Sequence, residues 1–205
     1  MSTPKENEYQ SMAFHPYNIM LTLVLFGVVM LFIALSASYI YTRVQFNIPP
    51  IRIPILFLFN TLILVARSYT MVLAKRNYLS DDTEGYQKSL IYTIILSVIF
   101  MVSQFYGWYD LFVSNDIAIN HSTTASYLYL ISFVHFAHVI AGLPFLIAFL
   151  WVAYRRMKEP VSVLVYFSDP EKQLKLNLLT RYWHFLDILW IYLVIFFYLN
   201  YFIQL

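Results

Sequence analysis

The chain has 205 residues, of which 60% are hydrophobic, 20% aromatic and only 12% charged, and its mean hydropathy is +0.65. Soluble domains carry about 25% charged residues, so this composition excludes a soluble globular fold and predicts apolar residues that face lipid or other protein. The net charge of +2 gives no argument for nucleic acid. The sequence contains no cysteine, which excludes disulfides, thiolate metal sites and covalently attached c-type haem.

Five mostly apolar runs follow the polar start of the chain, and each is long enough to cross a bilayer as a helix. They predict an all-α integral membrane protein with spans near residues 17–42, 53–74, 89–112, 125–153 and 183–202. The last helix is expected to begin earlier, near residue 170, because Ser168, Asp169, Pro170 and Glu171 combine capping side chains, a first-turn proline and an early carboxylate. We therefore expect residues 1–16 to form a tail and residues 17–205 to form a single bundle of five transmembrane helices.

The basic residues are distributed unevenly between alternate connections, and such a bias orients a membrane protein. The end that holds the N-terminus collects Lys5, Lys75, Arg76, Lys88, Arg155, Arg156, Lys158, Lys172, Lys175 and Arg181. The opposite end holds Arg43 and Arg52, and Arg67 lies inside the second span. The distribution predicts that residues 1–16 are a cytoplasmic tail and that the C-terminus is periplasmic or external.

Ionisable side chains inside a span are costly and mark a partner or a function. Arg67 and Asp187 carry opposite charges at similar depths in the second and fifth spans. We favour a buried ion pair that fixes helix register, and the alternative is a proton or anion path. In a third arrangement, Arg67 reaches the inner interface while Asp187 bonds to His184, one turn away.

His135 and His138 are three positions apart, so they project from one face of the fourth span. That spacing suits a metal, but the spans offer no further histidine, cysteine or carboxylate in a pattern that completes a site. We expect both imidazoles to hydrogen-bond neighbouring helices or backbone, and we predict no catalytic, cofactor-binding or metal-binding residue. Other polar residues within spans are expected to join helices: Asn60, Thr61, Ser68 and Gln104.

Three stretches together resemble the haem-copper oxidase subunit III family. Residues 181–190, which read RYWHFLDILW, resemble the signature that opens that family's last helix. Residues 135–142 look like its HxxHVxxG motif, and residues 54–68 look like its PxxFxxNTxxLxxSS helix. Gln104 and Tyr39 also match. Arg67 replaces the first serine of that SS pair, and Gly27 and Val28 stand where the family often carries a buried glutamate.

The resemblance implies an accessory subunit III of a bacterial haem-copper terminal oxidase, a cytochrome c oxidase, in the short five-helix form. Such a subunit resides in the bacterial plasma (inner) membrane, packs directly on subunit I, and has subunit II and a respiratory supercomplex as further partners. It binds phospholipid and supports O2 reduction and proton uptake, while the haems and copper belong to the partner subunits. Candidates for contact with lipid headgroups are Arg181, Tyr182, Trp183 and His184.

Two alternatives remain open on the sequence. The first stays in the family: a subunit III of a quinol oxidase, or the accessory protein of nitric oxide reductase. The second is a small membrane transporter that uses Arg67, Asp187 and the two histidines of the fourth span. Transporters tend to show repeated halves and interrupted helices, and the sequence displays neither pattern by eye.

Overall fold

The fold was obtained as a computed structural model, which describes residues 15–48, 51, 53–113, 122–157 and 159–203. Helices account for nearly all of these residues: α2 (Pro16–Gln45), α3 (Ile55–Leu79), α4 (Thr83–Val113), α5 (Thr123–Arg156), α6 (Pro160–Phe167) and α7 (Pro170–Phe202). Within the described ranges there is no β-strand. The predicted all-α fold is therefore confirmed.

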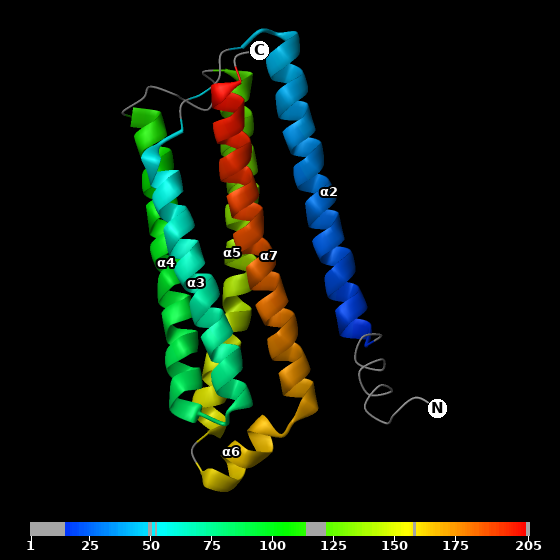
Figure 1. Cartoon of the computed structure of the whole chain (residues 1–205), viewed down its shortest axis with the longest axis vertical. Coiled ribbons are helices and arrows are strands. Elements are labelled where there is room, and N and C mark those ends of the chain that lie inside the picture. The colour runs from blue at the N-terminus through cyan, green and yellow to red at the C-terminus, as the bar shows by residue number, and fades with distance from the viewer. Residues whose placement is uncertain (1–14, 49–50, 52, 114–121, 158, 204–205) are drawn as a thin grey trace.

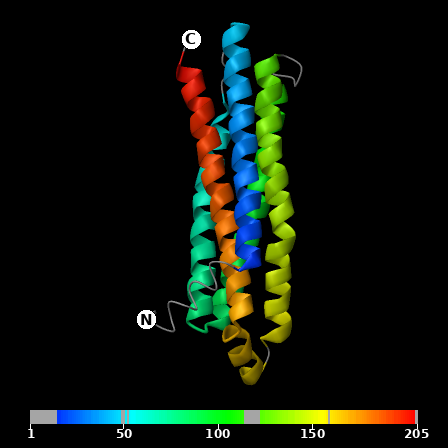
Figure 2. The ribbon, with the colours of Figure 1, turned by 90° about the vertical axis from the view of Figure 1, so that its right-hand side faces the viewer.

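The five long helices run side by side, and the short helix α6 lies across one end of the bundle (Figure 1). Each of the five is long and apolar enough to cross a membrane. The helices α3 and α4 form a tight hairpin, while α2 lies at the side of the bundle and packs against α5 and α7 (Figures 1 and 2). The N-terminal end of α2 and the helix α6 lie toward the same end of the molecule.

The helices extend beyond the apolar runs that predicted them. α3 continues to Leu79 instead of ending at residue 74, and α4 begins at Thr83 instead of residue 89. Hydropathy marks only the part of a helix that lies in lipid, whereas the backbone hydrogen bonds continue into the interface. The start of α7 at Pro170 agrees with the prediction, since the Asp169 carboxylate accepts a hydrogen bond from the Glu171 N–H at 3.0 Å.

Helix α6 was not predicted, because its eight residues are too short to give a periodic signal. It is held by the Tyr78 hydroxyl, which donates to the carbonyl of Tyr166 at 3.1 Å, and by edge-to-face contact between Tyr78 and Phe167. Residues 1–14 of the predicted tail lie outside the described residues, so the tail stays a prediction.

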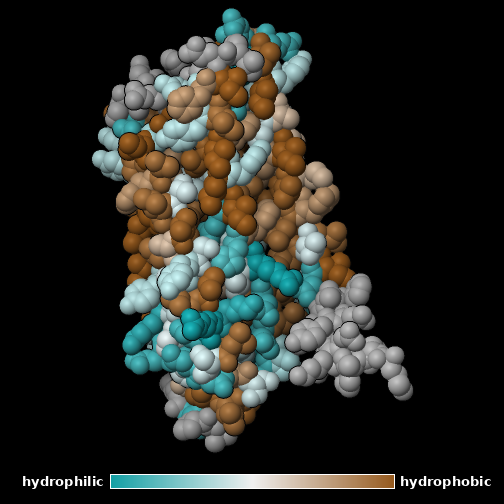
Figure 3. All heavy atoms as spheres, in the orientation of Figure 1, coloured by the Kyte–Doolittle hydropathy of each residue, from teal (hydrophilic) through white to brown (hydrophobic). Residues whose placement is uncertain are grey.

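Hydrophilic side chains gather in a band across the lower part of the face in Figure 3, above α6, while much of the upper part is hydrophobic. The described basic residues of this end are Lys75, Arg76, Lys88, Arg155, Arg156, Lys172, Lys175 and Arg181. The bundle thus has one strongly basic end, as predicted from the distribution of Lys and Arg between alternate connections.

Candidate functional site

The centre of the bundle holds an ion pair between Arg67 of α3 and Asp187 of α7. The two side chains are 1% and 7% exposed. Arg67 lies on the inward face of α3 in line with Asn60 and Leu64, at spacings of three and four residues. The interpretation of Arg67 and Asp187 as a buried pair agrees with the structure.

Aromatic rings close around this pair. The Arg67 guanidinium carbon lies 4.4 Å from the ring centroid of Trp183 and 6.0 Å from that of Phe100. A guanidinium over an aromatic face gains a cation–π attraction, which grows when water is excluded. Arg67 is therefore held inside the bundle, and the arrangement in which it reaches the lipid interface is wrong.

His184 bonds to Ser68 and not to Asp187, the partner considered in the arrangement in which Arg67 reaches the interface. Its Nδ1 lies 2.8 Å from the hydroxyl oxygen of Ser68, which joins α7 to α3 one turn away from the ion pair. Ser68 acts as the sequence predicted, as a polar residue that joins two helices. Asp187 therefore pairs with Arg67 and not with His184.

The two histidines of α5 behave differently from each other. His138 is half-buried, and its Nδ1 lies 2.7 Å from the backbone carbonyl oxygen of Val134 in the same helix, as predicted for these imidazoles. His135 is fully buried, and neither ring nitrogen has a hydrogen-bond partner among the described residues. Its ring lies 5.1 Å from that of Trp190 and 6.0 Å from that of Phe100, both measured between centroids. The expected hydrogen bond of His135 is thus wrong, because aromatic rings occupy its surroundings.

The two most specific sequence motifs contact each other across the α5–α7 interface. The Tyr182 hydroxyl donates to the backbone carbonyl of His138 at 2.7 Å. A Cβ atom placed on Gly142 would lie only 2.6 Å from the Tyr182 ring, so the absence of a side chain lets the helices approach. The HxxHVxxG and YWHF patterns thus form the two sides of one helix contact.

This contact changes the interpretation of the headgroup candidates. Trp183 is 1% exposed and packs on Arg67 inside the bundle, so in this chain its ring cannot meet a headgroup. Tyr182 and His184 are half-buried, with their polar atoms directed to α5 and α3. Only Arg181 is exposed, and its Nη1 lies 3.4 Å from the Asn18 side-chain oxygen.

The other polar residues of the spans divide in the same way. The Asn60 side-chain amide donates to Gln104 Oε1 at 2.9 Å and joins α3 to α4, as predicted. Thr61 bonds instead to the carbonyl of Phe57 in its own helix, at 3.1 Å, so the prediction that it joins helices is wrong. The sequence analysis missed a second α3–α4 link, the pair of hydroxyls of Thr70 and Thr93 at 2.9 Å.

Arg43 is a further residue that sequence reasoning missed, since it was counted only as a loop charge. It lies in the last turn of α2, is 3% exposed, and donates through Nη1 to the carbonyl of Asn200. Its Nη2 donates to the carbonyl of Ile203 at 2.6 Å. Cations are favoured beside the carbonyls that end a helix, so Arg43 ties the C-terminal ends of α2 and α7 together.

The Arg67–Asp187 pair and the aromatic rings around it come from four helices, α3, α4, α5 and α7, and no metal is required to account for their arrangement. Over the ranges that the structure describes, no group of three or more His, Asp or Glu residues lies close enough to hold a metal ion. Arg67 and Asp187 neutralise each other, the Trp183 and Phe100 rings face the guanidinium, and His135 and Trp190 pack against Phe100. This arrangement suits a polar junction that sets helix register.

Five long apolar helices with ionisable residues directed inward define a multi-pass membrane protein with a helical bundle. The sequence profile of the family described as Cytochrome c oxidase subunit III matches residues 18–201. The chain therefore belongs to the cytochrome c oxidase subunit III family.

Similar proteins come from several groups of organisms. A cytochrome c oxidase subunit 3 from Synechocystis is 30% identical over 85% of this chain and 75% of its own length. A probable cytochrome c oxidase subunit 3 from Nocardia farcinica is 28% identical over 79% of this chain and 77% of its own length. A cytochrome c oxidase subunit 3 from Drosophila yakuba is 27% identical over 74% of this chain, and the match covers only 51% of the length of that protein.

Proposed function

We propose that the chain is the accessory subunit III of a bacterial haem-copper terminal oxidase that takes electrons from cytochrome c. In this role it packs on subunit I, binds phospholipid and supports O2 reduction and proton uptake without carrying a redox centre. The observation that carries the proposal is the family match over residues 18–201, together with the names of the bacterial relatives.

The outer surface of the bundle supports the proposal that other subunits and lipid cover it. Large apolar side chains are exposed on every long helix, for example Met20 on α2, Leu62 on α3 and Val102 on α4, at 65%, 65% and 63%. A surface this apolar is stable only against lipid or a protein partner. Subunit I is the partner that the family assignment proposes.

The side chains of the chain support placing the haems and copper in partner subunits. The sequence has no cysteine and five histidines, and in the described part no three ligand residues gather. His135 and His138 lie on the same helix, but the His135 ring packs against Trp190 while His138 bonds to the Val134 carbonyl. The proposed contribution of this chain is therefore structural support and lipid contact.

The basic end of the bundle supports a location in the bacterial plasma membrane with the N-terminus in the cytoplasm. Arg181, which is exposed at that end, remains the candidate for contact with a lipid phosphate. Subunit II and a larger respiratory supercomplex are proposed as further partners.

Affinity purification of the tagged full chain from its native membranes tests the proposal. The expected result is co-purification of a subunit I with haem and copper absorption bands and of a subunit II with a cytochrome c-binding domain. A subunit II without copper would indicate a quinol oxidase, and a nitric oxide reductase partner would indicate the other family alternative. Purification of the chain without any haem protein would contradict the proposal and favour the transporter.

A further inference from the structure

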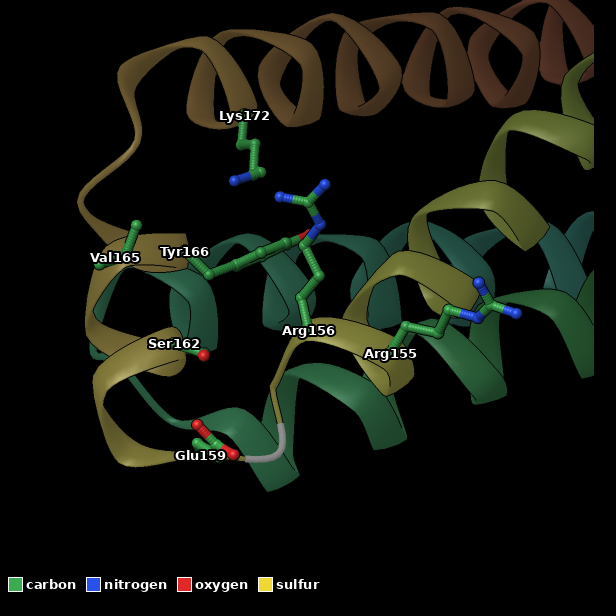
Figure 4. Close-up of a pocket in the computed structure, with 7 residues that line it drawn as sticks. All are labelled: Arg155, Arg156, Glu159, Ser162, Val165, Tyr166 and Lys172. Carbon is green, nitrogen blue, oxygen red and sulfur yellow. The ribbon is translucent and has the colours of Figure 1, made fainter.

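Two of the larger pockets lie at opposite ends of the bundle and differ in their chemistry. The pocket at the basic end, of about 500 Å³, is lined by charged side chains that include Arg155, Arg156, Glu159 and Lys172 (Figure 4). A groove of about 680 Å³ lies at the opposite end, between the last turns of α4 and the first turns of α5. We call it the aromatic groove, because α4 contributes Trp108, Tyr109 and Phe112 to its lining and α5 contributes Tyr129, Leu130 and Phe133.

Trp108 is the fixed part of the aromatic groove. Its Nε1 donates to Ser132 Oγ at 3.0 Å, and Ser132 is 1% exposed. The rings of Phe136 and Phe105 meet the indole edge to face, at 5.2 and 5.6 Å between centroids. A tryptophan that anchors a helix at the membrane interface presents its N–H to headgroups or water. Trp108 instead directs its N–H into the bundle, so the part of it that lines the groove is apolar.

Phe133 adjoins Trp108 and is exposed. The two ring centroids are 6.2 Å apart, with the ring planes tilted by 39°, and Phe133 is 57% exposed. On the α4 side, Tyr109 and Phe112 are also more than half exposed. Apolar surface of this extent gains free energy when a ligand covers it. The aromatic groove therefore offers ring surfaces at a set angle to a ligand from the membrane.

One end of the aromatic groove is more polar than the other. Ser126, which also lines it, lies in the first turn of α5. Phe133 lies seven residues, or about 10 Å, farther along the same helix. The Ser126 hydroxyl donates to the carbonyl of Ser122 at 3.3 Å, and a hydroxyl oxygen has two lone pairs that accept hydrogen bonds. The groove thus runs from a hydroxyl at the end of the bundle to aromatic rings deeper along it.

These features favour a neutral and rigid ligand. No charged residue among those described lines the aromatic groove, so the charged headgroup of a phospholipid would find no ion pair there. A flexible acyl chain loses conformational freedom when it is held against fixed walls, whereas a fused-ring system has little freedom to lose. A flat ring system also matches the aromatic surfaces of Trp108 and Phe133. A single hydroxyl on such a ligand would meet Ser126.

We propose that the aromatic groove binds a neutral lipid whose body is a rigid fused-ring system and whose polar group is one hydroxyl, the chemistry of sterols and hopanoids. The ring body packs against Trp108 and Phe133, and the ligand hydroxyl donates to Ser126 Oγ. The volume and lining of the groove are typical of small-molecule sites, which are mostly apolar with a few placed polar groups. The site requires a bundle that lies in a membrane, and it does not depend on the proposed oxidase role.

Titration with cholesterol, as a representative of this class, tests the proposal. The sample is the delipidated full chain with the subunits that co-purify with it, and native mass spectrometry measures the bound ligand. The comparison ligands are dioleoylglycerol, which has a hydroxyl and flexible chains, and cholestane, which has the rings without the hydroxyl. We expect one cholesterol to bind, more tightly than either comparison ligand. Cholesterol with a photoreactive diazirine should crosslink within residues 108–112 and 126–133.

Two variants locate the site. Phe133→Ala is expected to weaken cholesterol binding about tenfold or more, because it removes one of the ring surfaces. Phe145→Ala is the matched control, since Phe145 lies on the same helix, is 63% exposed and does not line the groove. Ser126→Ala should reduce the binding of cholesterol to the level of cholestane, while the binding of cholestane itself stays unchanged.

Each contrary result overturns a stated part of the proposal. Dioleoylglycerol or phosphatidylglycerol that binds as tightly as cholesterol, and is lost in Phe133→Ala, would replace the fused-ring ligand with an ordinary acyl chain. Equal binding by Phe133→Ala and Phe145→Ala would overturn the site, and so would crosslinks confined to other helices. A complex that binds no cholesterol, because another subunit covers the aromatic groove, would overturn the proposal as a whole.

Discussion

Arg67 and Asp187 are 120 positions apart in the chain, and they form a buried ion pair between α3 and α7. The carboxylate oxygen Oδ2 of Asp187 and the Nε and Nη1 groups of Arg67 have no further partner among the described residues. Each charge therefore depends on the other for most of its compensation. A buried pair of this kind is more costly to break than to remove.

We predict that Arg67→Leu or Asp187→Leu alone destabilises the protein by about 3 to 5 kcal/mol, whereas the double variant is nearly neutral. Each single change leaves one charge buried without a partner. The measurement is a double-mutant cycle on thermal unfolding in detergent. The exposed pair Glu84–Lys88 serves as the control cycle and is expected to show little coupling. Additive effects at Arg67 and Asp187 would show that the two side chains are independent.

A second prediction concerns the close approach of α5 and α7. Gly142→Ala is expected to destabilise by about 1 to 3 kcal/mol, because the new methyl group would overlap the Tyr182 ring. Gly27→Ala is the matched control, since a Cβ there meets nothing within 4 Å, and alanine favours a helix by about 0.5 to 1 kcal/mol. Melting temperatures of the two variants should move in opposite directions. A Gly142→Ala protein as stable as the unmodified chain would contradict the prediction, because it would mean that the Tyr182 ring or α7 moves away from α5 at no cost.

A third prediction follows from the unpartnered imidazole of His135. Its replacement by leucine is expected to be neutral or stabilising, because a buried polar group without a partner costs about 1 to 3 kcal/mol. His138→Leu removes the bond to the Val134 carbonyl and is expected to be the more damaging of the two. The measurement is the thermal stability of the His135→Leu and His138→Leu variants in detergent. The reverse order would contradict this account, because it would show that His135 makes a stabilising contact inside the bundle that exceeds the contribution of His138.

A fourth prediction concerns acid pH at the start of α7. The hydrogen bond from Lys172 holds the pKa of the Asp169 carboxyl below its ordinary value. Stability from this group is therefore present above the ordinary pKa of about 3.9 and is lost as the pH falls through the lower folded value. Hydrogen-exchange protection in the first turn of α7 should decline over that range. Asp169→Asn, which keeps a cap acceptor, should remove the part of this pH dependence that comes from Asp169, whereas Asp169→Ala should cost about 1 kcal/mol of helix stability at neutral pH and less at acid pH.

Much of the bundle follows from local sequence signals. The capping side chain of Asp169 and the proline after it predicted where α7 begins, because helix caps depend on neighbouring residues. The Arg67–Asp187 pair was also predictable, since depth along a helix follows from residue number once a span is placed. These features need no knowledge of how the helices turn toward one another.

Other features depend on that rotation and were missed. Trp183 is placed equally well by its sequence at a headgroup or in a core, because tryptophan is favoured in both environments. Its position over Arg67 is fixed by the packing of α7 on α3. Arg43 reaches the end of α7 because two helices that are distant in the sequence end side by side. No pattern within either helix carries that information.

Iron and copper analysis of two preparations tests the central claim most directly, that this chain supports an oxidase without holding its redox centres. One preparation is the complex that the tagged chain retains, and the other is the tagged chain after its partners are removed in detergent. We predict stoichiometric iron and copper in the complex and neither metal in the separated chain. Stoichiometric metal in the separated chain, or a complex without haem, would contradict the account.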